Sequence, residues 1–161
     1  MRHLIVTLLL LASMAARASV DFQNSEFTLT LGRDWVQVRL FFAEHFAFHS
    51  KALGVAAKIM TLDDPVRPQR THLVATKLLE EHIRRWRLDA GASAVVSDQT
   101  VNEIDGGTEA RYRGLDRLGR SSITIIRIKP MKSAILTFEA VGPDERNLEL
   151  AVRDVLHGFA Q

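Results

Sequence analysis

The sequence has no cysteine among its 161 residues. This absence excludes disulfide bonds, thiolate metal sites and thiol nucleophiles. It also excludes a lipoprotein, because no cysteine follows the N-terminal apolar run to carry a lipid. If the chain is exported, its fold must therefore depend on a hydrophobic core alone. A domain of about 140 residues can bury most of its apolar surface and does not need such covalent links.

The sequence also lacks an apolar run of the about 20 residues that span a membrane. The run from Leu4 to Met14 follows a short polar start and precedes Ala16-Arg17-Ala18, the small-x-small pattern of a cleavage site. We therefore predict that residues 1–18 are a signal peptide cleaved before Ser19, and that no membrane anchor remains. A retained N-terminal anchor is the alternative. Export would place the mature chain in the periplasm or outside the cell.

Neither sign of charge is in excess in the predicted mature chain. Loss of Arg2 and Arg17 with the leader reduces the 21 Lys and Arg to 19, which equals the number of Asp and Glu. A neutral domain lacks the basic excess of a general nucleic-acid-binding protein, so we expect no nucleic-acid partner. Residues 19–161 have the length of a single domain.

Familiar catalytic and metal-binding motifs are missing too. There is no G-x-S-x-G elbow, and no EF-hand spacing of oxygen ligands follows Asp63-Asp64. His45 and His49 come nearest to a metal pair. On a helix they would stand one turn apart and could chelate zinc, but on a strand they lie roughly 13 Å apart, which is too far for one ion. We favour the strand and expect neither a metal ion nor a cofactor.

Three consecutive antiparallel strands are predicted between Gly107 and Val141. Residues 108–114 alternate small or aromatic side chains with charged ones, which is the pattern of a strand with one wet face. Residues 122–129 are β-branched almost throughout, which predicts a central strand covered on both faces. Pro130 ends that strand, and a third follows from Ala134. Earlier strands are expected at residues 22–31, 35–40, 45–50, 55–62 and 93–104.

Helical spacing is found in two segments. The first runs from Arg70 to Leu88 and ends before Gly91, a typical C-terminal cap. The second follows Gly142-Pro143-Asp144 and extends to Phe159. The apolar stripe of the first helix comprises Leu73, Val74, Leu78, Ile83 and Trp86. This order of elements predicts an α+β fold, a layered sandwich in which two amphipathic helices cover a largely antiparallel sheet.

The chain resembles the PsbP-like superfamily, which includes PsbP photosystem proteins, Mog nuclear-import factors and DcrB-type bacterial envelope proteins. Four features carry the resemblance: FTLTLGRDW at residues 27–35, the helix between two sheet segments, the three-stranded meander, and the closing helix with Gly158-Phe159. They cover nearly all of residues 22–159. The resemblance implies a scaffold whose members mostly bind other proteins and share no active site, so it assigns no site residue. Unlike many DcrB-type proteins, this chain has no cysteine for a lipid anchor.

Two groups of residues are candidates for binding. Phe41 and Phe42, if exposed, would form an apolar patch for a protein partner. Arg111 and Arg113 share one strand face, and Arg127 lies alongside on the next strand, so the three could hold an anionic partner through forked hydrogen bonds. The alternative is that two acidic neighbours neutralise these arginines as surface ion pairs. Those neighbours are Glu109 and Glu139.

The preferred prediction is a non-enzymatic exported binding or accessory protein that holds a protein partner. An immunity or adaptor protein paired with a secreted toxin also fits a small, cysteine-free exported domain, although no residue points to it. The third possibility is a hydrolase or a metal-dependent enzyme. That function requires a pocket with converging polar groups and perturbed pKa values.

Overall fold

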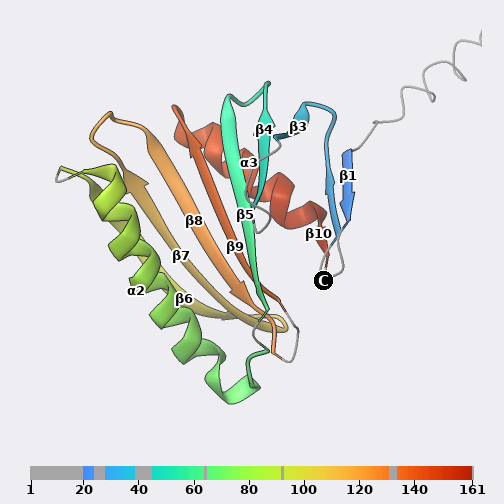
Figure 1. Ribbon diagram of the computed structural model, residues 1–161, viewed down its shortest axis with the longest axis vertical. Helices are drawn as coiled ribbons and strands as arrows, with labels where there is room; N and C mark the ends of the chain where they lie inside the picture. The colour runs from blue at the N-terminus through green and yellow to red at the C-terminus, as the bar shows by residue number, and fades with distance from the viewer. Residues whose placement is uncertain are drawn as a thin grey trace, which may run out of the picture.

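The computed structural model describes residues 20–23, 28–38, 45–63, 65–91, 93–130 and 134–160. Within them, two α-helices accompany a seven-stranded and a three-stranded sheet (Figure 1), and every strand pair is antiparallel. The strands are β1 (Val20–Gln23), β2 (Thr28–Leu31), β3 (Trp35–Val38), β4 (His45–Ser50), β5 (Val55–Asp63), β6 (Val95–Ile104), β7 (Gly107–Leu115), β8 (Ser121–Ile128), β9 (Ala134–Gly142) and β10 (Phe159–Ala160). The helices are α2 (Thr71–Ala90) and α3 (Glu145–Gly158), with a 3-10 turn, η1 (Pro68–Arg70), before α2.

The large sheet has the strand order β3-β4-β5-β9-β8-β7-β6. Strands β7, β8 and β9 form the predicted three-stranded meander, and β6 pairs with β7 at the edge of the sheet. Because β5 pairs with β9, the connection through α2 runs from the middle of the sheet to its edge. The β-branched run lies in β8, between β9 and β7, and residues 122–126 are all buried. The prediction of an interior strand covered on both faces is therefore confirmed, as is the α+β class.

One hydrophobic core lies between the sheet and α3. Because side chains alternate along a strand, every second residue of β5, β8 and β9 points into it. The small sheet β1-β2-β10 extends this layer, with α3 packed against β2. Asp144 caps α3 by accepting a hydrogen bond from the Asn147 amide at 2.9 Å. The largest core side chains are Leu29, Trp35, Phe48, Ile59, Ile123, Ile125, Leu136, Phe138 and Leu148.

A second core lies between the opposite face and α2. Ala75, Leu79, Ile83 and Trp86 of the helix pack on strand residues that include Tyr112. The helix ends where predicted, because Gly91 has a φ of 97° that favours glycine. Its apolar stripe is rotated from the predicted one. Leu73 is 49% exposed, while Thr71, Ala75 and Leu79 occupy the buried side.

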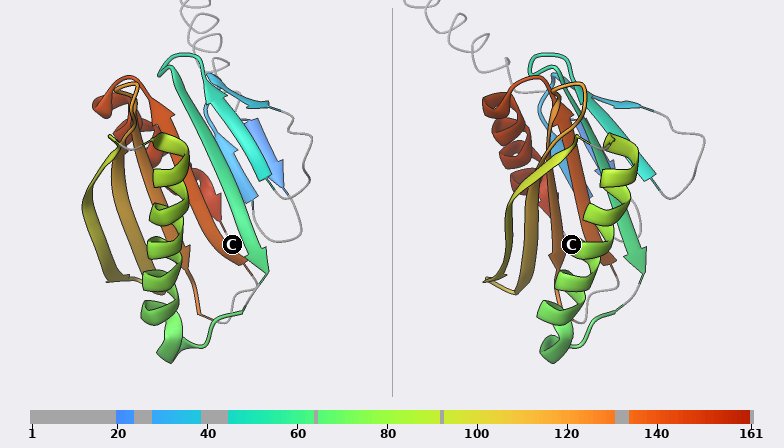
Figure 2. Two further views of the ribbon diagram at one scale, coloured as in Figure 1. Left: turned by 60° about the vertical axis from the view of Figure 1, so that its left-hand side comes forward. Right: turned by 90° about the vertical axis from the view of Figure 1, so that its left-hand side faces the viewer.

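The helix α2 is too narrow to cover its face of the sheet. A helix with side chains is about 10 Å wide and strands lie about 4.8 Å apart, so one helix covers about three strands. Accordingly α2 packs on β6, β7 and β8. Figure 2 shows β5 and β4 beside the helix and not behind it. We call the α2-side surface of β3, β4 and β5 the open half-face, because no described helix or strand packs on it. β9 lies at its border, since Ile135 and Thr137 on the same side are buried.

The predicted strand over residues 22–31 is wrong in one respect. β1 and β2 are separate strands that pair with each other, Val20 with Leu31 and Gln23 with Thr28. Because this pairing is antiparallel, the segment cannot be one continuous strand. Polar residues Asn24 and Ser25 stand between the two strands in the sequence and mark the interruption.

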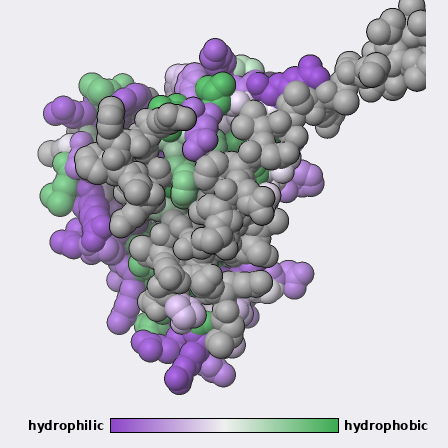
Figure 3. Space-filling model, turned by 45° about the vertical axis from the view of Figure 1, so that its right-hand side comes forward, coloured by the Kyte–Doolittle hydropathy of each residue, from purple (hydrophilic) through white to green (hydrophobic). Residues whose placement is uncertain are grey.

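Two further predictions lie outside the described residues. The predicted signal peptide, residues 1–18, and the pair Phe41 and Phe42 belong to segments that the structure does not describe. Neither of the described helices is long and apolar enough to cross a membrane. On the side shown in Figure 3, hydrophilic side chains gather along the left-hand edge and the lower end, and hydrophobic ones form small separate groups among the described residues.

The interior position of β8 can be tested with Ile125→Asp. Ile125 is completely buried, and an unpaired buried charge should reduce the free energy of unfolding by about 4 kcal/mol or more. Urea denaturation measures the change. If that variant does not fold, Ile125→Ala should still lose about 3 kcal/mol. The matched control is Leu88→Asp on α2, where the leucine is 77% exposed and wild-type stability is expected. Wild-type stability of both Ile125 variants would contradict this packing.

Candidate functional site

Two of the predicted binding arginines form ion pairs that join β7 to α3. Arg111 and Arg113 both donate to Glu149, and Arg113 also contacts Glu145 at 3.4 Å and Asp98 at 3.1 Å. Both side chains are about three-quarters buried. They lie on one face as predicted, and helix acids neutralise them. An acidic partner would have to displace Glu149 to reach these guanidinium groups.

The third predicted arginine, Arg127, lies on the same face and pairs with Glu109, with Nε donating to Oε2 at 2.6 Å. Glu109 therefore acts as the alternative prediction expected. Glu139 does not, because it points to the opposite face of the sheet, away from all three arginines. Its neighbours Phe138 and Ala140 occupy the α3-side core, and alternation places Glu139 on the α2 side.

The open half-face carries mostly small and apolar side chains. Trp35 points into the α3-side core, so Val36 and Val38 face the other way, and they are 40% and 44% exposed. Ala47 of β4 pairs with Val38, and Met60 of β5 lies beyond it on the same face. Unlike the face of the sheet that packs against α3, this surface leaves part of its apolar area in contact with water.

A row of cross-strand neighbours connects the open half-face to the space beneath α2. It runs from Val38 and Ala47 through four residues that we call the polar row: Lys58 on β5, Glu139 on β9, Thr124 on β8 and Tyr112 on β7. Each residue pairs directly with the next. Lys58 and Glu139 are partly buried, whereas Thr124 and Tyr112 are completely buried.

The polar row ends in a hydrogen bond to α2. His82 Nδ1 and Tyr112 Oη lie 3.0 Å apart, and Trp86 packs edge-on against the tyrosine ring. The Thr124 hydroxyl faces the same tyrosine but falls short of full hydrogen-bond geometry. Burial raises the pKa of Tyr112 and lowers that of His82, with the charges of Lys58 and Arg85 adding to the latter effect. Both side chains are therefore neutral at pH 7.

Glu139 is a partly buried carboxyl group whose ionised form destabilises the fold. Burial raises the pKa of Glu139, the charge of Lys58 opposes this rise and that of Asp89 adds to it. No hydrogen bond or ion pair of its side chain is found among the described residues, and Lys58 acts only from a distance. A partly buried carboxylate without a direct partner destabilises the fold, and such groups often mark a binding site.

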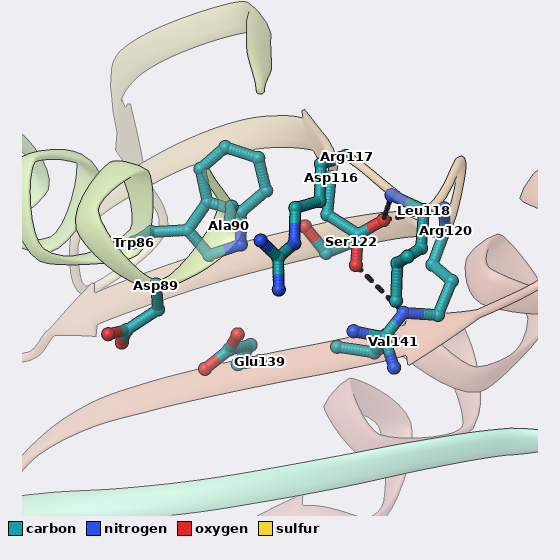
Figure 4. Close-up of a pocket in the computed structure, with 10 residues that line it drawn as sticks. All are labelled: Trp86, Asp89, Ala90, Asp116, Arg117, Leu118, Arg120, Ser122, Glu139 and Val141. Atoms are coloured by element: carbon teal, nitrogen blue, oxygen red, sulfur yellow. Dashed lines mark hydrogen bonds and ion pairs between the residues drawn. The ribbon is translucent and has the colours of Figure 1, made fainter. Parts of the chain in front are cut away.

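A cavity of about 240 Å³ lies above Glu139, at the C-terminal end of α2. Its walls are the helix end with Trp86 and Asp89, the β7–β8 turn with Arg117 and Arg120, and the β9 residues Glu139 and Val141. Figure 4 shows the Arg117 guanidinium pointing into the cavity between Trp86 and Glu139, with the carboxylates of Asp89 and Glu139 on one side of it.

The turn that forms one wall is fixed to the helix. The Arg117 amide donates to the Ala90 carbonyl at 3.1 Å. Asp116 accepts bonds from the amides of Leu118 and Arg120 and from Arg120 Nε at 2.7 Å, and these contacts, the Arg120 amide first, lower the pKa of Asp116. Arg120 and Asp116 thus neutralise each other.

The opposite wall depends on a glycine. A Cβ at Gly114 would lie 2.5 Å from the indole ring of Trp86, so only glycine lets this ring rest on β7. Trp86 is almost completely buried, which confirms that it packs at the core, and one edge of it also borders the cavity. Trp35, the other tryptophan, is completely buried on the far side of the sheet.

The histidines that the structure describes lie on three elements. His45 and His49 lie on β4, as the strand prediction required. His72 and His82 both lie on α2, where the His82 ring is within hydrogen-bond distance of Tyr112. Among the residues that the structure describes, no group of three or more His, Asp or Glu side chains could hold a metal ion.

Sequence reasoning missed the polar row and the cavity. A signal was present, because Lys58 and Glu139 are isolated charges in the interior of largely apolar strands. Such a charge indicates a position that a partner or a neighbouring charge must compensate. That the two residues are neighbours depends on the pairing of β5 with β9, which are far apart in the sequence.

The fold and these features define an α+β sandwich with one sheet face covered only in part. No protein-family model matches the sequence, and no curated protein shows detectable similarity to it. Solved structures do match. Cyanobacterial PsbP (CyanoP) from Synechocystis sp. PCC 6803 aligns with a TM-score of 0.63 and 11% identity over 88% of this chain and 91% of that one. The Ran-binding protein Mog1p of Saccharomyces cerevisiae aligns with 0.54 and 6% over 90% and 96%.

The chain therefore has the PsbP/Mog1-like fold, and the resemblance drawn from the sequence is confirmed at the level of fold. At these identities the likeness concerns the arrangement of helices and strands. The function of a site still has to be argued from its own residues.

Replacing Glu139 should show the cost of its burial. The unfolded carboxyl titrates near 4.5 and the folded one higher, so the folded chain binds more protons between these values and stability falls as pH rises. Glu139→Gln should therefore raise the melting temperature at pH 7, and the gain should vanish near pH 4. The matched variant Glu149→Gln removes a paired carboxylate and should instead cost about 1 kcal/mol at pH 7. A destabilised Glu139→Gln at pH 7 would contradict this account.

His82 should make the stability depend on pH in the opposite sense. Its pKa in the folded chain lies below the unfolded value of 6.5, so the unfolded chain binds more protons between the two. Stability should be complete above pH 6.5 and decline as pH falls through this window. In His82→Gln the decline between pH 7 and pH 5.5 should be smaller, as measured by urea denaturation at each pH. Equal slopes for the two proteins would refute the assignment.

Proposed function

We propose that this chain is an exported, non-enzymatic accessory protein that holds a protein partner on its open half-face. The observation that carries the proposal is that α2 packs mainly on β6, β7 and β8, while Val36 and Val38 of β3 are exposed on the same side of the sheet. An exposed apolar strip bordered by charged groups is the composition of a protein interface.

The position of the predicted aromatic pair supports the same surface. Phe41 and Phe42 belong to the segment that joins β3 to β4, the two strands at the exposed end of the open half-face. Aromatic residues are enriched at the centres of protein interfaces. We therefore include both in the proposed binding surface.

The solved structures that share the fold agree with a binding role. One of them is a Ran-binding protein, so this scaffold can carry a surface for a protein partner. The export step rests on the sequence of residues 1–18, with its apolar run and small-x-small site. Arg111, Arg113 and Arg127 lie on the other face of the sheet. They stay candidates for a second contact, in which acidic groups of a partner would replace Glu149 and Glu109.

No specific observation favours the two other functions. In the cavity, the hydrogen-bonded pair of ionisable side chains among the described residues is Arg120 with Asp116, and turn amides already engage that carboxylate. An acid and a base poised for catalysis would need a different arrangement. A role as a toxin immunity protein likewise has no residue of its own in this structure.

The proposed surface can be tested by capture from a periplasmic extract. Immobilised wild-type chain should retain a defined partner, and Val38→Asp should reduce its affinity about tenfold or more, because a charge replaces a desolvated apolar contact. Leu88→Asp, on the outer side of α2, is the matched control and should retain the partner fully.

Photo-crosslinking from position 38 then tests whether the captured protein touches this surface. A crosslink from position 38 and none from position 88 is expected. Equal capture of the partner by the wild type and Val38→Asp would contradict the proposal. So would the absence of a specifically retained protein on the wild-type chain.

A further inference from the structure

Three charged groups that face the cavity at the end of α2 lack a direct partner. Arg117, Asp89 and Glu139 form no side-chain hydrogen bond or ion pair with any other described residue, in contrast to Arg120 and Asp116 beside them. All three residues line the cavity, and Figure 4 shows the Arg117 guanidinium between Trp86 and Glu139, with the carboxylates of Asp89 and Glu139 on one side of it. The cavity thus presents one unpaired cation and two unpaired anions together.

The rest of the lining combines apolar and polar side chains. Trp86, Ala90, Leu118 and Val141 provide the apolar part, and Ser122 and the paired Asp116 and Arg120 provide the polar part. The volume of about 240 Å³ lies below the about 300 Å³ at which sites for drug-sized ligands begin. Any occupant must therefore be a small molecule, and it must carry both signs of charge if it is to compensate these groups.

We propose that this cavity binds an α-amino acid with a short apolar side chain. The ligand carboxylate receives a forked pair of hydrogen bonds from the Arg117 guanidinium, which is the geometry that arginine offers to carboxylates. The ligand ammonium lies between Asp89 and Glu139. The side chain packs against Trp86 and Val141.

Each element of the site has a structural reason to be where it is. Glu139 is positioned by β9 and is already desolvated, so a ligand ammonium supplies the direct partner that it lacks. Arg117 is exposed on a turn whose amide is bonded to the helix end, so its base is fixed while its guanidinium can turn towards a carboxylate. Trp86 is held against Gly114 and provides a rigid apolar wall.

The site is independent of the proposed docking surface. It uses the helix end, the β7–β8 turn and Glu139 and Val141 of β9, whereas the docking surface is centred on β3 and β4. Val38→Asp should leave amino-acid binding unchanged, and Arg117→Gln should leave partner capture unchanged. Failure of either proposal can therefore be distinguished from failure of the other.

The test is calorimetric titration of the purified chain with L-leucine, L-valine and L-methionine. At least one should bind saturably. The methyl ester of that amino acid lacks the carboxylate and its N-acetyl derivative lacks the ammonium, so each should bind about tenfold more weakly, as expected for loss of a charge-assisted hydrogen bond.

Two variants assign the two ends of the ligand. Arg117→Gln should lower affinity for the free amino acid to that for the ester, and leave the affinity for the ester unchanged. Glu139→Gln should lower the affinity for the free amino acid to that for the N-acetyl derivative, and leave the affinity for the N-acetyl derivative unchanged. Arg87→Gln, an exposed arginine of α2 that does not line this cavity, is the matched control and should bind like the wild type. No saturable binding of the three amino acids up to about 10 mM, or equal binding of ester and free amino acid, would overturn the proposal.

Discussion

The mismatch in width between a helix and a seven-stranded sheet governs this structure. Strands about 4.8 Å apart make a sheet far wider than one helix of about 10 Å. On one face the chain adds the small sheet β1-β2-β10 beside α3, and the core there is continuous from Leu29 to Val155. On the other face α2 is the only described helix, so among the described elements the part formed by β3, β4 and β5 receives no equivalent cover.

The edge of α2 separates two kinds of strand residue on this face of the sheet, buried neutral residues under the helix and partly exposed charged residues beside it. Along the polar row, the residues under the helix are neutral and completely buried, and those beyond its edge are Glu139 and Lys58, which keep partial access to water. A carboxyl group one strand further along the polar row, at the position of Thr124, would be completely buried under α2. The present position of Glu139 costs some stability, as the raised pKa indicates, but leaves the carboxyl accessible from the cavity.

Local signals predicted most of the elements. The β-branched run of β8, the helical spacing of α2 and Gly91 at its end each act over a few residues, and all three were confirmed. The order of elements was enough to predict the PsbP-like fold. The errors concern relations that a local pattern does not contain: the rotation of α2, which exposes Leu73, and the pairing of β1 with β2. The site was harder still, because the polar row exists only after β5 has paired in register with β9 of the consecutive strands β7, β8 and β9, and β5 and β9 are far apart in the sequence.

The arginines also show that a local sequence pattern does not reveal tertiary contacts. Clustering in the sequence selected Arg111, Arg113 and Arg127, yet the docking of α3 supplies Glu145 and Glu149 to the first two, and the adjacent strand supplies Glu109 to the third. Arg117 belonged to no cluster, and it lines the cavity at the end of α2 without an ion pair to any described residue. An arginine becomes available for a ligand when the fold places no carboxylate within reach, so availability is decided by tertiary contacts. In this chain those contacts neutralise the α3 face and leave unpaired charge on the α2 face, beside the surface that the helix does not cover.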